Sequence, residues 1–460
     1  MITPIIVALY FAAMIAVSVV VYRKGKASTS SGFFVAARKG STPLIVGSLC
    51  ATIMGSSVVV GMAGLGYTRG LSGAWWLLAG TVGLSILFLF FARKVRSLGL
   101  YTLPEVLESQ YGGLTGLAAS ILIVVAWIAV IAGQIVAAGK ILTVILPGNL
   151  SLMMAIAAFV FIIYTVLGGQ YSVLHTDLIQ FSILGMGLLV SAWLVFSQVG
   201  GVGGLASSLP QGHLSFPVSP GFGWANILSF LVLVGGPYIV GPDIYSRLFC
   251  ARNEAVARSS AGWAALTTIP VAFLIVFVGM GALVLFPGIA AEEAFPTVIN
   301  DLLPVGVSGL VIAALLAAVM SSADTCLLTT STILSVDICK RAFRYLGEHR
   351  TLLISRIGIV VIGLLALVIA LKLRGIIDSL LLAYTIFTSG VVIPLLAGFY
   401  KDKLKLKPVG ALAGIVGGGG VSLGIELSGI GISKLIALAV CVILLFGVSW
   451  IAPGSGKKWK

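Results

Sequence analysis

The chain has 460 residues, of which 59% are hydrophobic and only 9% are charged. This composition excludes a soluble globular domain and is typical of an integral membrane protein. The net charge of +14 does not indicate nucleic-acid binding, because Lys and Arg lie in short loops beside apolar segments, which is the pattern of the positive-inside rule.

The N-terminal segment is apolar over its first 22 residues, and the basic residues follow it rather than precede it. This order predicts a retained membrane span instead of a cleaved signal peptide. Along the whole chain, windows of about 20 apolar residues predict about thirteen spans. They are expected near 3–22, 43–67, 72–92, 115–144, 151–168, 173–198, 222–248, 257–286, 305–338, 352–371, 375–399, 409–428 and 431–452.

The loops between these spans alternate in charge. One set holds most of the Lys and Arg residues, whereas the other holds few of them together with Glu292, Glu293 and Asp301. This asymmetry predicts a multi-pass protein of the plasma membrane with its N-terminus outside and its C-terminus in the cytoplasm. An odd number of spans is consistent with that orientation.

The spans also suggest an internal repeat, with five in 43–198 and five in 222–399. A unit with an odd number of spans must invert when it is repeated. The first span of each unit is interrupted by Gly or Pro, and paired interruptions indicate the substrate and ion site of a transporter. The expected divisions are an N-terminal helix with its loop (1–42), a first repeat with an outer loop (43–221), a second repeat (222–400) and two C-terminal helices with a short tail (401–460).

The span near 305–338 carries an unusual number of hydroxyl groups and one carboxylate. Ala318, Ser321, Ser322 and Thr325 follow an i, i+3, i+4 spacing and share one helix face. An ionisable residue such as Asp324 within a membrane helix is by default a functional-site hypothesis. Small hydroxyl residues also join packed helices, so this segment alone leaves both interpretations open.

Four stretches together resemble the sodium:solute symporter family, which includes proline, glucose, pantothenate, sialic acid and iodide carriers. They are 48–67, 164–181, 313–338 and 387–400, and the second carries the family's Gly-Gly…Thr-Asp…Gln signature. The resemblance covers about 1–400. It implies an all-α membrane protein of the LeuT type, with five-plus-five inverted repeats and transport driven by a Na⁺ gradient.

The resemblance further implies a Na⁺ site between the interrupted span 43–67 and the span 305–338. Its ligands correspond to the backbone carbonyls of Ala51, Met54 and Ala318 and the hydroxyls of Ser321 and Ser322. Neutral oxygen atoms of this kind suit a hard cation, and a helix break frees carbonyl groups to act as ligands.

Three more residues are candidates for Na⁺ exit or for a second cation position. Asp177 resembles an inner way-station for departing Na⁺, although a carboxylate at a helix N-terminus is also favoured by the helix dipole. Asp324 and Thr325 could line a second cation position, or Asp324 could be a packing group held by its neighbours. Asp243 is expected to form an i, i+4 ion pair with Arg247.

The substrate is expected at mid-membrane beside the two breaks. Gln134 is a lone amide in an apolar helix and needs a partner, which is either the solute or another helix. Trp75 is a candidate for stacking on the solute and equally for an interfacial aromatic belt. The full candidate set is Ser56, Ser57, Trp75, Gln134, Gly236, Pro237, Tyr238, Thr385 and Thr388.

The predicted function is Na⁺-coupled symport of a small organic solute into the cell by alternating access. Sugar-transporting family members carry a Glu near the start of the third span, where this chain has no acid in 71–74, so an amino acid such as proline or a carboxylate is favoured. The alternatives are a membrane sensor of transporter-like fold and an H⁺-coupled transporter. We expect no enzymatic activity and no cofactor beyond Na⁺ as the coupling ion, with the solute and the lipid bilayer as partners.

Overall fold

The computed structural model describes residues 2–24, 28–55, 57–343, 346–373, 375–428 and 435–452. The described chain is helical, and its β-pairing is limited to two isolated bridges. The α-helices, in chain order, are α1 (Ile2–Arg23), α2 (Ser30–Val35), α3 (Thr42–Ile53), α4 (Met62–Arg69), α5 (Trp75–Ile86), α6 (Ala92–Ser97), α7 (Leu103–Tyr111), α8 (Gly113–Ile145), α9 (Leu150–Gln198), α10 (Gly201–Ser208), α11 (Trp224–Leu233), α12 (Gly235–Val240), α13 (Pro242–Cys250), α14 (Glu254–Leu285), α15 (Ala294–Leu302), α16 (Val305–Thr332), α17 (Lys340–Ala342), α18 (Glu348–Leu373), α19 (Ile376–Phe387), α20 (Ile393–Gly398), α21 (Lys401–Leu404), α22 (Pro408–Ser428) and α23 (Leu435–Ile451). Short 3₁₀ or π segments are η1 (Ala36–Arg38), η2 (Ser57–Gly61), η3 (Gly70–Ala74), η4 (Leu87–Phe91), η5 (Ala291–Glu293), η6 (Ile333–Cys339) and η7 (Thr388–Val392).

Among the described residues, ten helical stretches are long and apolar enough to cross a membrane. Two of them, Ser57–Ser97 and Leu150–Gln198, each contain parts of two expected spans. The helices Thr42–Ile53 and Leu435–Ile451 are apolar but shorter. These lengths confirm a multi-pass architecture, and the total of thirteen spans stays a prediction.

Helix α9 shows why two expected spans form one continuous helical stretch. Its 49 residues include Gly169, whose φ of 57° and ψ of −168° are not helical, so the chain bends there without a loop. A Cβ atom at this position would lie 2.6 Å from the ring of Phe33. Glycine is therefore required twice, for its backbone conformation and for the close approach of α2.

The two expected helix breaks are present. Helix α3 ends at Ile53, and the backbone of Met54 (φ −82°, ψ 44°) leaves the helical region before η2 begins at Ser57. In the second unit, α12 and α13 are separated by Gly241, whose ψ of 137° is extended. Pro242 then starts α13, a position where the missing N–H of proline costs no helical hydrogen bond.

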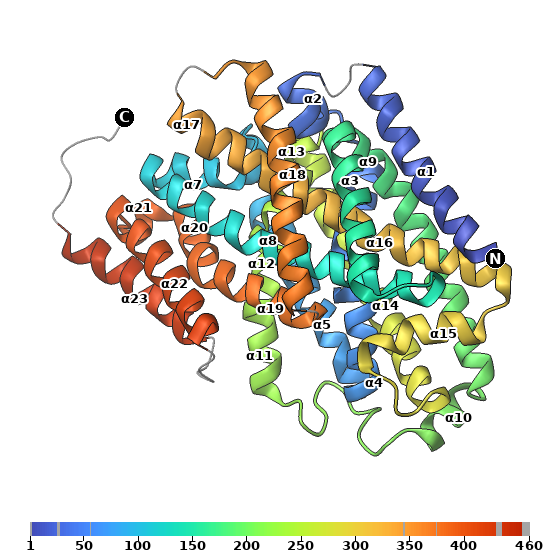
Figure 1. The fold of residues 1–460 in the computed structure, drawn as a ribbon. Helices are drawn as coiled ribbons and strands as arrows, with labels where there is room; N and C mark the ends of the chain where they lie inside the picture. Colours follow the sequence, from blue (N-terminus) through green and yellow to red (C-terminus); the bar gives the residue numbers. More distant parts are fainter. Residues whose placement is uncertain are drawn as a thin grey trace.

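The loops predicted to share the basic side contact one another. Gly40 forms a bridge with Ala251, and Arg96 donates a hydrogen bond from Nε to the Ala251 carbonyl at 2.6 Å. Arg341 forms an ion pair with Glu108 of α7. In Figure 1, the short helices α2, α7 and α17 accordingly lie toward one end of the bundle.

The opposite set of loops also forms its own contacts. Lys140 pairs with Glu292, and Glu292 Oε1 accepts a hydrogen bond from the Ile376 backbone at 3.2 Å. The Leu71 N–H donates to the His213 carbonyl at 2.8 Å. Helices α4, α10 and α15 lie toward this end in Figure 1. The loops that share a charge pattern in the sequence therefore also lie at the same end of the bundle.

Helix α16 forms the centre of the bundle. It packs against α1, α8, α9 and α18, and the end of α3 also contacts it. Its residues from Val311 to Thr330 are buried, including the hydroxyl and carboxylate groups. Helices α22 and α23 pack on each other and on η7, apart from this centre (Figure 1).

Candidate functional site

The site is built where the end of α3 meets α16. The Ser321 hydroxyl donates to the Ala51 and Ala318 carbonyls, both at 2.9 Å. The Ser322 hydroxyl donates to the Thr52 carbonyl at 2.6 Å and lies 3.4 Å from the Ala318 carbonyl. Five neutral oxygen atoms from two helices thus converge in a buried region. Four of the five expected cation-binding residues are among those that supply them.

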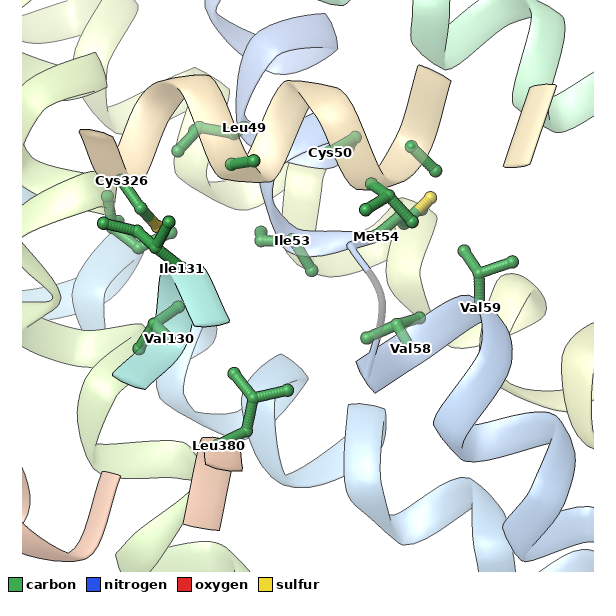
Figure 2. Close-up of a cluster of buried hydrophobic side chains, with 14 of the residues drawn as sticks. Leu49, Cys50, Ile53, Met54, Val58, Val59, Val130, Ile131, Cys326 and Leu380 are labelled. Atoms are coloured by element: carbon green, nitrogen blue, oxygen red, sulfur yellow. The ribbon is translucent and has the colours of Figure 1, made fainter. Parts of the chain in front are cut away.

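The fifth, Met54, lies next to this cluster at the break itself. Its N–H donates to the Cys50 carbonyl at 2.9 Å, and its side chain is buried. In Figure 2 the ribbon leaves helical form at Met54, with Ile53 and Val58 on either side of the turn. Because the chain stops being helical here, the carbonyls of the last turn of α3 are not all used within the helix.

Gly55 allows the break to approach α16. A Cβ atom built on it would lie 2.4 Å from Ser322 Oγ and 3.1 Å from Gln134 Nε2. No side chain fits in that space unless Ser322 moves. The glycine therefore fixes the distance between the break, the serine pair and α8.

A second polar cluster lies beside the first. Arg247 of α13 is fully buried and forms an ion pair with Asp177 Oδ2 at 3.1 Å. The same guanidinium nitrogen, Nη2, donates to the hydroxyls of Thr325 and Thr52. Asp177 also accepts a hydrogen bond from Ser48. The expected pair of Asp243 with Arg247 is thus replaced by a pair that joins α13 to α9.

Thr325 connects the two clusters. Its hydroxyl donates to the Ser321 carbonyl at 2.6 Å and lies 3.4 Å from Asp324 Oδ1. Asp324 is fully buried, and no hydrogen bond reaches its Oδ2 atom among the described residues. Asp177 and Thr325 therefore both contact the Arg247 guanidinium group, and Asp324 is linked to that guanidinium through Thr325.

A cavity adjoins the break and shares Thr52 with the cluster around Arg247. Its enclosed volume is only about 30 Å³, so the cavity is narrow in this conformation. It is lined by Thr52, Ile53, Gly55, Ser57, Trp127, Val130, Gln134, Pro237, Tyr238, Asp243, Ile244, Ser322, Cys326 and Tyr384. Both helix breaks therefore contribute to one cavity, and Ser322 joins that cavity to the oxygen cluster.

Four of the nine expected substrate residues line this cavity, namely Ser57, Gln134, Pro237 and Tyr238. Trp75 does not; it donates from Nε1 to the Pro217 carbonyl at 2.9 Å and stacks on Phe216. It therefore packs against the loop before α11.

Three of the remaining candidates, Gly236, Thr385 and Thr388, do not line the cavity. Thr388 donates to the Leu233 carbonyl at 3.3 Å and packs against Gly236. Thr385 donates to the Leu381 carbonyl of its own helix at 2.6 Å. Ser56 lies outside the described residues.

Several cavity residues were not predicted from the sequence, and Trp127, Tyr384 and Asp243 are the aromatic and acidic ones among them. Trp127 and Tyr384 resemble ordinary core aromatic residues, since each stands in an apolar helix. Asp243 has a clearer signal, because it is an acid directly after Gly241 and Pro242 at an interrupted span. The nearby Arg247 masked that signal by offering a local partner.

The sequence profile described as "Sodium:solute symporter family" matches residues 33–418. A sodium/glucose cotransporter of Vibrio parahaemolyticus is 27% identical over 455 residues, covering 89% of this chain and 82% of that protein. The human sodium/myo-inositol cotransporter 2 is 26% identical, covering 79% of this chain and 60% of its own length, so this chain spans less than two thirds of that relative. A Na⁺-coupled sialic acid symporter, solved in a substrate-bound outward-open state, superposes with a TM-score of 0.84 at 19% identity, covering 98% of both chains.

Proposed function

The chain belongs to the sodium:solute symporter family, and on this basis we propose that it imports a small organic solute together with Na⁺ by alternating access. The solute would bind in the cavity between the two breaks. Na⁺ would bind beside it at the carbonyls of Ala51, Met54 and Ala318 and the hydroxyls of Ser321 and Ser322. Ser322 contributes to both places, which would couple the two binding events.

The observation that carries this proposal is the contact of both serine hydroxyls with the carbonyls at the end of α3. Neutral hydroxyl and carbonyl oxygens suit a hard cation and do not favour a transition metal. An ion there would take over the carbonyl lone pairs that now accept from Ser321 and Ser322. Binding would therefore hold α3 of the first repeat and α16 of the second in one arrangement, as alternating access around a fixed site requires.

We propose that Asp177, Asp324 and Thr325 act in Na⁺ release rather than as a second resident site. The Arg247 guanidinium already contacts Asp177 and Thr325, so the position of a second cation is taken in this conformation. Na⁺ leaving the serine pair would meet Thr325 first and then compete with Arg247 for Asp177.

The proposed orientation places the N-terminus outside and the C-terminus in the cytoplasm of the plasma membrane. The basic loops that contact one another at one end of the bundle support it. The proposed repeats, 43–221 and 222–400, are supported by one helix break in each.

The proposed substrate class is a small amino acid such as proline, or a carboxylate. The narrow cavity and the lack of an acid in 71–74 support a small solute over a sugar. A polyol is the second candidate, because sugar and inositol cotransporters are among the relatives and because Gln134 and Asp243 can both hydrogen-bond to hydroxyl groups.

Uptake into proteoliposomes tests the function. We expect one class among amino acids, short carboxylates, polyols and sugars to accumulate with an inward Na⁺ gradient and not with an inward K⁺ gradient of the same size. The rate should not respond to an inward H⁺ gradient at constant Na⁺. Accumulation that follows H⁺ and ignores Na⁺ would contradict the proposal.

Gly55→Ala provides a structural test of the same site. The added methyl group would meet Ser322 at 2.4 Å and push it from the α3 carbonyls. Overpacking of this kind costs about 1–3 kcal/mol, so the Na⁺ concentration for half-maximal uptake should rise roughly 10- to 100-fold. Gly185→Ala is the matched control, because no atom lies within 4 Å of its added Cβ. Equal Na⁺ dependence of both variants would count against the site.

A further inference from the structure

The cavity has one feature that the Na⁺ site does not use. Among the described residues that line the cavity, Asp243 is the one carboxylic acid, and none of the lining residues is Lys, Arg or His. Asp243 is also partly exposed, whereas the rest of α13 from Ile244 onward is buried. A carboxylate therefore faces the cavity between the two helix breaks.

No cation of the described chain neutralises this carboxylate through an ion pair. Arg247 lies one turn further along α13, but its guanidinium contacts Asp177, Thr325 and Thr52. Asp243 stands in the first turn of α13, where the helix dipole favours the ionised form. The Asp243 carboxylate therefore remains available to a ligand in the cavity.

Aromatic rings complete the surroundings of Asp243. Trp127, Tyr238 and Tyr384 line the same cavity from three different helices. The face of an aromatic ring attracts a cation, and the attraction increases when water is excluded. A carboxylate beside such rings is suited to a protonated amine. An anionic or neutral solute would gain no charge pairing from Asp243.

We propose that Asp243 selects the solute by forming an ion pair with its ammonium group. This inference rests on the proposed function and narrows its substrate class to small amines, with amino acids first. Simple carboxylates are excluded as the main substrate because Asp243 would repel them. Polyols lose the ion pair and would bind more weakly than an amine of the same size.

Matched solutes test the proposal on the purified full-length protein. L-alanine is compared with L-lactate, and L-proline with tetrahydrofuroate, within a panel that also holds the other proteinogenic amino acids, glucose and myo-inositol. Binding is measured as ligand-induced thermal stabilisation, and transport as Na⁺-driven uptake into proteoliposomes. We expect an amino acid to bind and its hydroxy or ether analogue to bind at least tenfold more weakly.

The variant Asp243→Asn should weaken amine binding roughly 10- to 100-fold, as expected for the loss of a charge-assisted hydrogen bond. Asp243→Glu should recover part of it, and both variants should still bind radioactive Na⁺. Asp402→Asn, which removes an exposed acid near the C-terminal helices, is the control.

Three results would overturn the inference. They are wild-type affinity in Asp243→Asn, equal binding of an amine and its analogue, and binding of polyols or carboxylates with no amine bound at all. The two readouts separate this inference from the proposed function. Amine binding that needs Asp243, without Na⁺-driven uptake, would keep the role of Asp243 and reject symport.

Discussion

Replacing both Ser321 and Ser322 with Ala is expected to abolish Na⁺-stimulated uptake. The two hydroxyls contact the carbonyls of Ala51, Thr52 and Ala318, and each is a proposed ligand of the ion. A lost contact to a charged group costs about 1.5–3 kcal/mol, so the pair together should weaken Na⁺ binding by at least about 100-fold. Uptake as a function of Na⁺ concentration measures the effect. Direct binding of radioactive Na⁺ shows whether the change lies in Na⁺ affinity.

Ser331→Ala is the matched control for the serine pair. Ser331 is also a buried serine of α16, and its hydroxyl donates to the Leu328 carbonyl at 2.9 Å. Its loss should change thermal stability about as much as one of the site serines and leave the Na⁺ dependence unchanged. If the double variant keeps the wild-type Na⁺ dependence, the ion binds elsewhere.

The second large effect is expected from Arg247→Gln. This change leaves the Asp177 carboxylate buried without its cation, and breaking a buried pair from one side costs about 3–5 kcal/mol. The purified variant should therefore unfold at a clearly lower temperature than the wild type. Na⁺ should stabilise the variant more than K⁺ does, because Na⁺ can enter the position that the guanidinium left.

The double variant Asp177→Asn/Arg247→Gln separates lost charge pairing from lost packing. Removing both charges should restore most of the stability that the single variant loses, since no uncompensated charge remains. Arg252→Gln, at an exposed arginine close by in sequence, should behave as the wild type. A double variant no more stable than the single one would show that the ion pair does not hold α13 to α9.

Local patterns were enough to predict the helix breaks and the shared face of the α16 hydroxyls, whereas the assignment of Ser321 and Ser322 to Na⁺ came from the family resemblance and stays a prediction. Gly and Pro mark positions where a helix is costly, and the hydroxyls of α16 recur at helical spacing. Both features can be recognised within short stretches of sequence. The structure adds that Gly55 is in contact with Ser322, a pair separated by more than half of the chain.

The surroundings of Asp243 could not be predicted in the same way. Its spacing to Arg247 favours a local ion pair, yet Arg247 reaches Asp177 on another helix because a buried guanidinium must find a buried partner. Trp75 shows the same limit, since its partners Phe216 and Pro217 lie far along the chain. Long-range packing decided both positions, and periodicity carries no information about it.

The most direct test of the account is the simultaneous flux of Na⁺ and solute in the same proteoliposomes. Radioactive Na⁺ and a transported solute would be followed together, with the membrane potential clamped. We predict that the solute accelerates Na⁺ entry in a fixed ratio, that Na⁺ accelerates solute entry, and that Ser321→Ala/Ser322→Ala removes both effects. Solute entry that leaves the Na⁺ flux unchanged would contradict Na⁺-coupled symport.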